Sequence, residues 1–557
     1  MKHFYTLAII FLAFSSAHGQ TGQLLDRTQS SLSPSESDYN RFVDMDTGQQ
    51  QQLYSNPAFY EMLYRNGLLY HPMQYKSILS TGYSQGKKKG DYLLAEGNEY
   101  SDYRIMGNGE YSIPTAGTLF GSIQYARGKH SNIGWSTIRH PELYQPYVTT
   151  DTIGGDYHYE DYQASGGYSF RLGEWYMGAH AWFQGEQAYR KTDPRALNNT
   201  TWLGFEAGVG KLFHNHLLMF QAGYERNKQH VTLRFWRPGE QQRFLVAYGF
   251  GLYDVHQSTI SFGYSRMYYI NQGNAALTYL SPQDKLLSFY AHLAYKFHHV
   301  MTEESSTAKN LYYSHIHQFE PTLRIDYRLA SSLSLSLQAE GEIEMKKGHE
   351  NIFDQYLVDE NYYIYDYRLI DTQQNYSCSK YSGNVRLKAD YTINPTHKVH
   401  ILGGVALSNR EEKYKSDYKI KNQAIYPHAG IGYRLNHKRS ELELNGTYIY
   451  KHLLDNEYNV DMENTSIEHL DFQHAFCPYA YYNSTYSSIN LSAVFQYRLT
   501  RGAVGVNLKL MYKTGERDKN TTYTSTIGFA NLGAPMLFPV PDKHDELWGS
   551  AGIFYAW

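Results

Sequence analysis

Residues 333–344 read LSLSLQAEGEIE, and this alternation decides the fold class. Every odd position is Leu, Ala, Gly or Ile, and every even position is Ser, Gln or Glu. Successive side chains of an extended strand point to opposite faces, so this stretch has one apolar face and one polar, increasingly acidic face. Helical spacing would not separate the two classes so cleanly. The stretch predicts a β-strand that lies between two different environments.

The same period of two returns in residues 385–391, 441–450 and 504–510. Very short turns join strand-like segments in pairs, at residues 114–116, 172–174, 213–215, 281–284, 328–332, 394–397, 436–438 and 500–502. Long polar segments separate the pairs, at residues 129–158, 231–271, 347–380, 453–485 and 517–544. Short turns on one side and long loops on the other are typical of an outer-membrane barrel.

We therefore predict an all-β fold, a transmembrane antiparallel β-barrel of about 18 strands, with short periplasmic turns and long extracellular loops. The segment 231–271 sets the range of this prediction. It reads either as a folded outer loop or as strand extensions, and one hairpin more or less there gives about 20 or 16 strands.

The composition agrees with this class. The mean hydropathy of −0.58 resembles that of a soluble chain, yet 16% of the residues are aromatic. A barrel wall that alternates apolar and polar residues and carries aromatic girdles explains both values. The net charge of −3 gives no reason to expect a nucleic-acid partner.

The two ends of the chain indicate export and membrane insertion. Residues 1–19 fit a signal peptide, with Lys2 and His3 before an apolar run and a small-x-small cleavage site. Ile553, Tyr555 and Trp557 share one face of a last strand, which resembles the signal read by the barrel assembly machinery. We expect residues 75–557 to form a barrel in the lipid of a Gram-negative outer membrane.

Residues 20–74 are expected to form an N-terminal periplasmic arm or plug. Asn56-Pro57-Ala58 opens an aromatic amphipathic stretch and is similar to the hatch of long-chain fatty-acid transporters. A loop packed on the periplasmic rim is the alternative interpretation of this stretch.

Charged residues on the polar register are the candidates for lining the lumen. An Arg or Lys on the lipid face near the midplane would cost about 2–4 kcal/mol, so this register must face inward. The candidates are Arg324, Asp326, Arg328, Glu340, Glu342, Glu344, Arg386, Lys388, Asp390, Glu441, Glu443 and Lys509. They form either a selectivity lining for a polar solute or a salt-bridged, hydrated wall, and the mixed signs favour the wall.

Other chemistry finds little support in the sequence. His298-His299 and His315-x-His317 lack a carboxylate or cysteine at diagnostic spacing, so no metal and no cofactor is expected. Nucleophile-elbow, zinc-protease and phosphate-loop motifs are absent, so no catalytic residue is assigned and the chain is not expected to be an enzyme. Cys378 and Cys477 are placed in different outer loops, and their pairing stays open.

The segment 143–199 carries a more specific likeness. It contains LYQPYV at 143–148, GGD at 154–156, GGYSFR at 166–171 and YRKTDPR at 189–195. This order resembles an uncharacterised outer-membrane β-barrel family, a domain of unknown function of Bacteroides-type bacteria. Ala196 departs from the second proline expected after Asp-Pro-Arg. The resemblance implies fold and compartment, and it brings no activity.

Two functions follow as expectations. The first is a porin-like channel or uptake component for a small polar solute. The alternative is a non-conducting barrel that acts as binding or assembly partner of a surface lipoprotein or energy-coupled receptor.

Overall fold

The computed structural model describes residues 49, 52–66, 77–113, 116–151, 153–236, 242–249, 252–258, 264–282, 285–305, 309–359, 364–415, 418–460, 469–470, 479, 481–517 and 543–557. Within these residues, eighteen strands form one sheet in which each strand pairs antiparallel with its neighbours along the chain. The strands are β1 (Ser77–Gly90), β2 (Glu99–Ile113), β3 (Gly117–Ile133), β5 (Gly155–Leu172), β6 (Trp175–Arg190), β7 (Arg195–Phe213), β8 (His216–Arg234), β11 (Tyr264–Leu280), β12 (Leu287–Glu304), β13 (Lys309–Ala330), β14 (Leu333–Asp359), β15 (Ile364–Asn394), β16 (His397–Tyr414), β17 (Tyr418–His437), β18 (Ser440–Val460), β20 (Ser484–Leu499), β21 (Gly502–Arg517) and β22 (Lys543–Ala556).

The sheet closes on itself through its first and last strands. β1 pairs with β22 from Ile78 opposite Ala556 to Gly90 opposite His544. Closure leaves no strand edge in the wall, and a wall in lipid requires this because lipid supplies no hydrogen bonds to backbone groups. The predicted antiparallel barrel of about 18 strands is confirmed.

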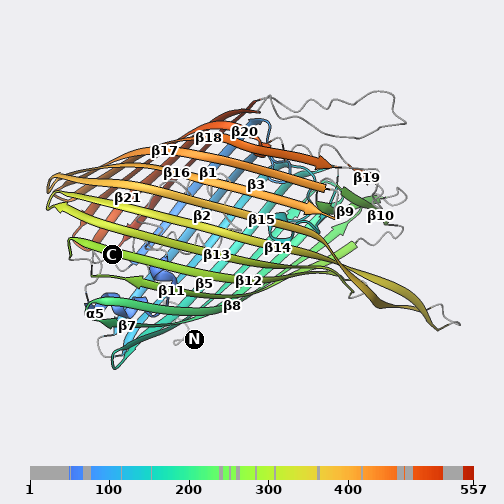
Figure 1. Cartoon of the computed structure of the whole chain (residues 1–557), viewed down its shortest axis with the longest axis horizontal. Coiled ribbons are helices and arrows are strands. Elements are labelled where there is room, and N and C mark those ends of the chain that lie inside the picture. The colour runs from blue at the N-terminus through green and yellow to red at the C-terminus, as the bar shows by residue number, and fades with distance from the viewer. Residues whose placement is uncertain are drawn as a thin grey trace.

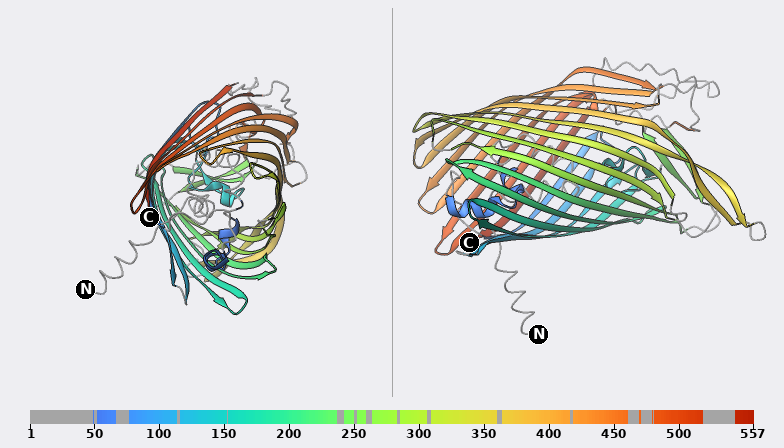
Figure 2. Two further views of the ribbon diagram at one scale, coloured as in Figure 1. Left: turned by 90° about the vertical axis from the view of Figure 1, so that its left-hand side faces the viewer. Right: turned by 60° about the horizontal axis from the view of Figure 1, so that its bottom comes forward.

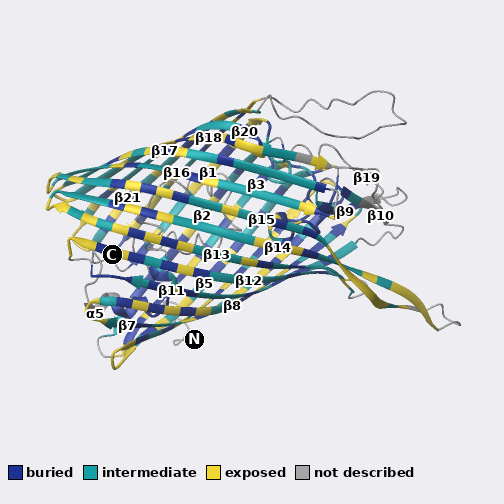
Figure 3. Cartoon of the chain, in the orientation of Figure 1, coloured by how far each residue is buried: buried dark blue, intermediate teal, exposed yellow. Residues whose placement is uncertain are grey.

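Burial alternates along much of the wall, as Figure 3 shows. On β13, Leu323 is 60% exposed and Ile325 is 38% exposed, whereas Arg324 between them is 8% exposed. An exposed apolar side and a buried polar side are the arrangement of a barrel whose outside faces lipid and whose inside faces a lumen. The chain is therefore an outer-membrane barrel.

All the predicted tight turns lie at one end of the barrel. β20 ends at Leu499 and β21 begins at Gly502, for example, and the other seven turns join consecutive strands in the same way. The two ends of the barrel sequence lie here too, since the Trp557 amide donates to the Ser77 carbonyl at 2.8 Å. We call this the inner, periplasmic end and the opposite one the outer end.

The segment 231–271 agrees with both interpretations given for it. Its part that forms a folded outer loop is β9 (Gln242–Gly249) and β10 (Leu252–Ser258), which join β4 (Thr149–Thr150) and β19 (His469–Leu470) in a separate four-stranded sheet, and β11 extends the wall from Tyr264. The prediction that 347–380 is a loop was wrong: β14 and β15 run through it and project beyond the barrel (Figure 1). The alternating pattern weakens there because both faces of the projecting hairpin are exposed. Cys378 thus lies within β15, where it is buried and has no disulfide partner among the described residues.

Two helices lie inside the ring of strands (Figure 2). α5 (Phe59–Asn66) lies at the inner end, and α6 (Pro141–Tyr144) lies toward the outer end. Among the described helices, none is long and apolar enough to cross a bilayer. The signal-peptide residues, Cys477 and most of residues 517–544 lie outside the described part of the chain.

Candidate functional site: the plugged lumen

Residues 52–66, which we call the inner plug, pack against the lumen wall at the inner end. Tyr54, Phe59, Tyr60 and Met62 bury their side chains against wall residues that include Phe120. The apolar residues of this segment recur at amphipathic spacing, so they lie on one side of it. This side packs against the wall. Of the predicted arm 20–74, this is most of the part that the structure describes, and it lies within the lumen.

Side-chain hydrogen bonds add to this contact from both ends of the inner plug. Gln52 donates to Thr322 at 2.9 Å and accepts from the Tyr290 hydroxyl at 2.9 Å. At the other end, Glu61 accepts from the Thr118 hydroxyl at 2.8 Å. The wall partners belong to β3, β12 and β13, so the plug is anchored to distant parts of the ring.

Asn56 explains the Asn-Pro-Ala sequence that the aromatic stretch begins with. Its Oδ1 accepts from the Ala58 amide at 3.0 Å, which fixes the turn before α5, and its Nδ2 donates to the Phe220 carbonyl at 3.0 Å. The side chain is 1% exposed. One residue therefore both shapes the plug and attaches it to β8.

Two wall glycines make room for the plug backbone. A Cβ atom at Gly208 would meet Asn56 Oδ1 at 2.0 Å, and a Cβ atom at Gly178 would meet the Pro57 carbonyl carbon at 2.4 Å. Both distances are far below van der Waals contact, so only glycine fits at these positions. Sequence analysis missed these two residues, because a glycine in a strand gives no sign of what approaches it.

Residues 134–151, which we call the outer plug, fill the lumen toward the outer end. The Tyr144 hydroxyl bonds Asn227 on β8, and the Thr149 amide donates to the Tyr268 hydroxyl on β11 at 3.0 Å. Arg190 on β6 donates to Asp151 at 2.7 Å, with both side chains buried. These contacts hold the segment to the inner face of three strands.

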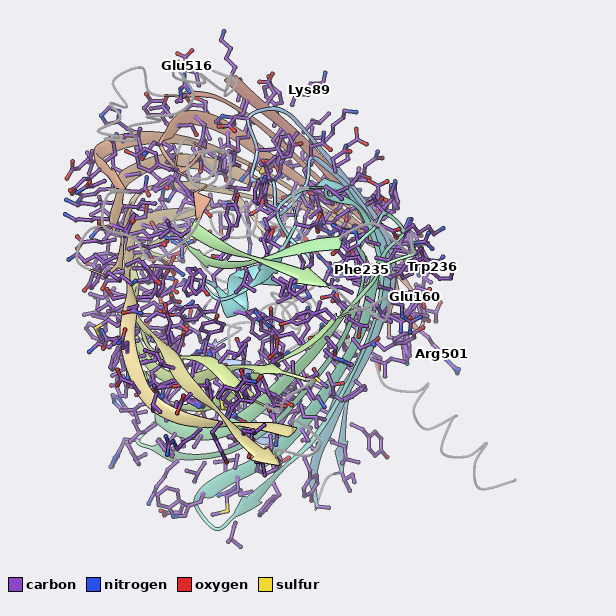
Figure 4. All side chains as sticks on the ribbon, turned by 90° about the vertical axis from the view of Figure 1, so that its right-hand side faces the viewer. Lys89, Glu160, Phe235, Trp236, Arg501 and Glu516 are labelled. Carbon is purple, nitrogen blue, oxygen red and sulfur yellow. The ribbon has the colours of Figure 1, made fainter. Side chains whose placement is uncertain are left out.

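The β9–β10 hairpin covers the outer plug. The Ala247 amide donates to the Val148 carbonyl at 2.9 Å, and Phe244, Val246 and Leu252 are buried with it in the same apolar core. The Tyr147 ring stacks on the Tyr312 ring of β13 at 4.6 Å. Figure 4 shows the hairpin lying across the outer mouth. Many of the tyrosines that the sequence displays therefore form a packed core inside the mouth.

A buried charge cluster fastens the outer plug to β6. His140 Nε2 lies 2.9 Å from Glu186 Oε1, and Arg139 Nε lies 3.6 Å from Glu186 Oε2. Burial alone lowers the pKa of His140, but the Glu186 carboxylate raises it to about 9, with Glu142 contributing. His140 is therefore a cation at neutral pH and forms an ion pair across the plug–wall boundary.

The predicted lining residues lie on β13, β14, β15, β18 and β21, on the face opposite the exposed apolar side chains. Ion pairs join Arg324 to Asp326 at 2.9 Å, Glu340 to Arg386 at 2.7 Å, Glu344 to Lys380 at 2.8 Å, Lys388 to Asp390 at 3.3 Å and Glu443 to Arg434 at 2.6 Å. Glu342 accepts from Gln318 at 3.1 Å, and Glu441 lies 3.5 Å from Arg498. Arg328 and Lys509 are half-buried on the same register. The structure brings neighbouring charges together in pairs along the wall, and a role in solute selection stays a prediction.

The predicted insertion signal lies on the outside of the barrel. Ile553 is 58% exposed, and the Tyr555 and Trp557 rings stack at 5.2 Å beside it. The Tyr555 hydroxyl donates to the Arg501 carbonyl at 2.6 Å, which ties the last strand to the turn before β21.

The histidines noted in the sequence lie in strands. His299 on β12 and His315 on β13 face outward with ring centroids 4.9 Å apart, and the His349 ring stacks on Tyr313 at 4.5 Å. No group of three potential ligands that could hold a metal is found among the described residues. An aromatic girdle at the membrane surface accounts for this arrangement.

These features define a class of protein, an outer-membrane β-barrel that carries a plug at each end of its lumen. The chain belongs to the family of unknown function DUF6850, whose model matches residues 66–531. No curated protein matches it.

The matches among solved structures include receptors and transporters. The ferric preacinetobactin receptor BauA from Acinetobacter baumannii is 9% identical, with 86% of this chain and 80% of that chain covered and a TM-score of 0.39. The FrpB iron transporter from Neisseria meningitidis is 8% identical, with 85% and 81% covered and a TM-score of 0.37. The family assignment names the chain's relatives without assigning an activity.

Proposed function

We propose that this barrel is an uptake channel for a small polar solute and that the inner plug keeps it closed at rest. The observation that carries the proposal is the way in which the plug is held. It fits over two wall glycines and is anchored by single side-chain hydrogen bonds to separate strands. Neither these bonds nor the buried apolar side chains of the plug belong to the strand pairing that closes the wall, so the plug can leave while the wall stays intact.

The wall behind the plug supports the same proposal. The lumen face of the strands is polar, and its charges are paired, as in Arg386 with Glu340. A wall of paired charges stays hydrated without the help of the plug. Barrels of this strand number enclose an aqueous lumen unless something fills it.

Planar-bilayer recording tests the proposal. We compare the full-length mature protein with a chain that begins at Gln74 and therefore lacks the arm. The expected result is a closed full-length barrel and intermittent openings from the shortened one, in which the outer plug alone lies in the lumen. Silence from both proteins contradicts the channel.

The alternative partner role has one observation in its favour, the projecting β14–β15 hairpin (Figure 1). Beyond Glu350, β14 has no further pairing with β13 in the described residues, and β15 pairs with β16 only from Tyr376 onward. Exposed Val358 and Leu369 lie in this part, where two open strand edges suit the addition of a partner's strand. A steady current from the full-length barrel contradicts a closed partner role.

A further inference from the structure

Four lumen-facing residues on neighbouring strands, which we call the amide patch, carry polar atoms that the fold leaves unused. They are Asn108 on β2, Gln124 on β3, Gln163 on β5 and Trp182 on β6, and they are 2%, 4%, 5% and 6% exposed. Both amide atoms of Asn108 and Gln124, Oε1 of Gln163 and Nε1 of Trp182 find no hydrogen-bond partner among the described residues. Buried polar atoms are rarely left in this state, and here four such residues lie on neighbouring strands.

The four residues lie side by side because of the register in which their strands pair. Gln124 lies directly opposite Gln163. Asn108 is linked to Trp182 along one row of pairs through Ser122 and Ser165. Three strand spacings separate β2 from β6, which makes the patch about 14 Å wide.

The patch lies between the two plugs. Toward the inner end, Phe120 is two residues from Ser122, and its ring stacks on the Tyr60 ring of the inner plug. Toward the outer end, Glu186 holds the outer plug through His140. A solute that crosses the lumen after the plugs move must therefore pass this stretch of wall.

The neighbours of the patch fix how its groups are presented. Gln163 donates its Nε2 to Asp161 at 2.6 Å, so its Oε1 is the atom left over. Gln184 donates to the other Asp161 oxygen at 3.1 Å, which satisfies the carboxylate with amides. The Trp182 indole lies across Gly204, where a Cβ atom would meet its nitrogen at 2.2 Å. The indole is thereby held flat against the wall, as a platform for a ring.

The chemistry of these groups defines the solute. The unused atoms are three acceptors (Asn108 Oδ1, Gln124 Oε1 and Gln163 Oε1) and three donors (Asn108 Nδ2, Gln124 Nε2 and Trp182 Nε1). A hydroxyl group donates and accepts through one atom, so a hydroxyl-rich molecule matches this equal set. The patch itself contains no charged side chain, and this favours a neutral molecule.

We propose that the amide patch is the binding surface for a neutral, hydroxyl-rich solute of two or three sugar-sized rings. The inference rests on the proposed channel function and adds the class of solute. With the plugs in place the patch is covered and its polar atoms cost stability. When the lumen opens, the solute's hydroxyls supply the missing partners.

The first test is a flux measurement in liposomes with full-length Gly208→Val, in which the new side chain displaces the inner plug. Maltotriose entry and potassium current are recorded for this protein and for the same protein with Asn108→Leu and Gln124→Leu. We expect about tenfold slower maltotriose entry from the loss of hydrogen bonds, with an unchanged potassium current. Gln272→Leu, another buried lumen glutamine, is the matched control and should leave both rates unchanged. Equal maltotriose entry with and without the patch substitutions overturns the inference.

The second test does not depend on ion conduction. The unfolding midpoint of full-length Gly208→Val, the parent protein of this test because its inner plug is displaced, is measured in detergent with maltotriose, with trialanine and with neither. We expect maltotriose to raise the midpoint, because a ligand of the native state stabilises it. The double variant should show a higher midpoint without sugar and no sugar-dependent rise.

The outcomes separate the two proposals. A rise with trialanine alone assigns the patch to peptides and overturns the inference, as does the absence of any maltotriose-dependent rise in the parent protein. If Gly208→Val carries no potassium current, the channel proposal fails, and the midpoint measurement alone decides the patch.

Discussion

The Tyr60 ring of the inner plug lies parallel to the Phe120 ring of β3, with centroids 3.7 Å apart and an interplanar angle of 3°. Both rings are buried, and the pair is the most intimate apolar contact between the plug and the wall. In the proposed channel, the strength of this contact contributes to how often the inner plug leaves the lumen.

Tyr60→Ala is therefore expected to destabilise the closed state by about 3 kcal/mol, the usual cost of removing a buried aromatic ring. Single-channel recording of the full-length variant should show brief openings that the parent lacks. Tyr60→Phe keeps the stacked ring and should stay closed. Openings of equal frequency in both variants contradict the assignment of closure to this ring contact.

Gly208→Val should open the barrel by a steric route. Its Cβ would lie 2.0 Å from Asn56 Oδ1, so the plug has to move away. We expect intermittent current from the full-length variant, because the outer plug remains, and faster proteolysis of the N-terminal arm. Gly403→Val is the matched control, because a Cβ there meets nothing within 4 Å. A closed Gly208→Val barrel would contradict closure by the inner plug and, with it, the proposed channel.

The outer plug should respond to alkaline pH through His140. Its folded pKa of about 9 lies above the unfolded value of about 6.5. The pair with Glu186 therefore stabilises the fold fully below about pH 6.5 and loses its effect as the pH rises through about 9. The unfolding midpoint of His140→Gln should lie below that of the parent at pH 6 and converge with it by about pH 10. His214→Gln, in an exposed turn at the inner end, should show no such difference. Parallel curves across this range count against the ion pair.

The paired wall can be tested at Arg386, which is 3% exposed and bonds Glu340 at 2.7 Å. Arg386→Met leaves the Glu340 carboxylate without its cation. Because Glu340 is 31% exposed, we expect a loss of about 1–3 kcal/mol, below the 3–5 kcal/mol of a fully buried pair. Denaturant unfolding measures this, and the double variant with Glu340→Met should recover most of the loss. A large change in cation–anion selectivity with unchanged stability would favour the selectivity lining instead.

Deleting Trp557 should impair assembly. The residue stacks on Tyr555, and its amide bonds Ser77 at the closing seam. We expect a lower amount of folded, heat-modifiable barrel in the membrane fraction, whereas Trp557→Phe should assemble normally. Normal membrane levels of the deletion protein would rule out this role.

The wall was predictable from the sequence because one face of it contacts lipid and the other faces the lumen. Apolar and polar residues therefore alternate along the strands, as Leu323 and Arg324 do. The tight turns were predictable for a similar reason, since each interrupts that alternation briefly. The projecting hairpin was not, because Asp354 and Arg368 lie where neither environment constrains the pattern. The lumen contents depend on contacts across more than a hundred residues, as between Asn56 and Phe220, and local sequence carries no trace of such contacts.

Gly178 and Gly208 have a consequence for the comparison of related barrels. The shape of the wall matches the inner plug at two positions, on β6 and β7, where glycine leaves room for the plug. A relative with glycine at both sites has room for an inner plug, whereas a relative with a bulky residue at either site does not. If the proposed function holds, closed and permanently open members of the family can be distinguished by the residues at these two positions, without reference to the sequence of the inner plug.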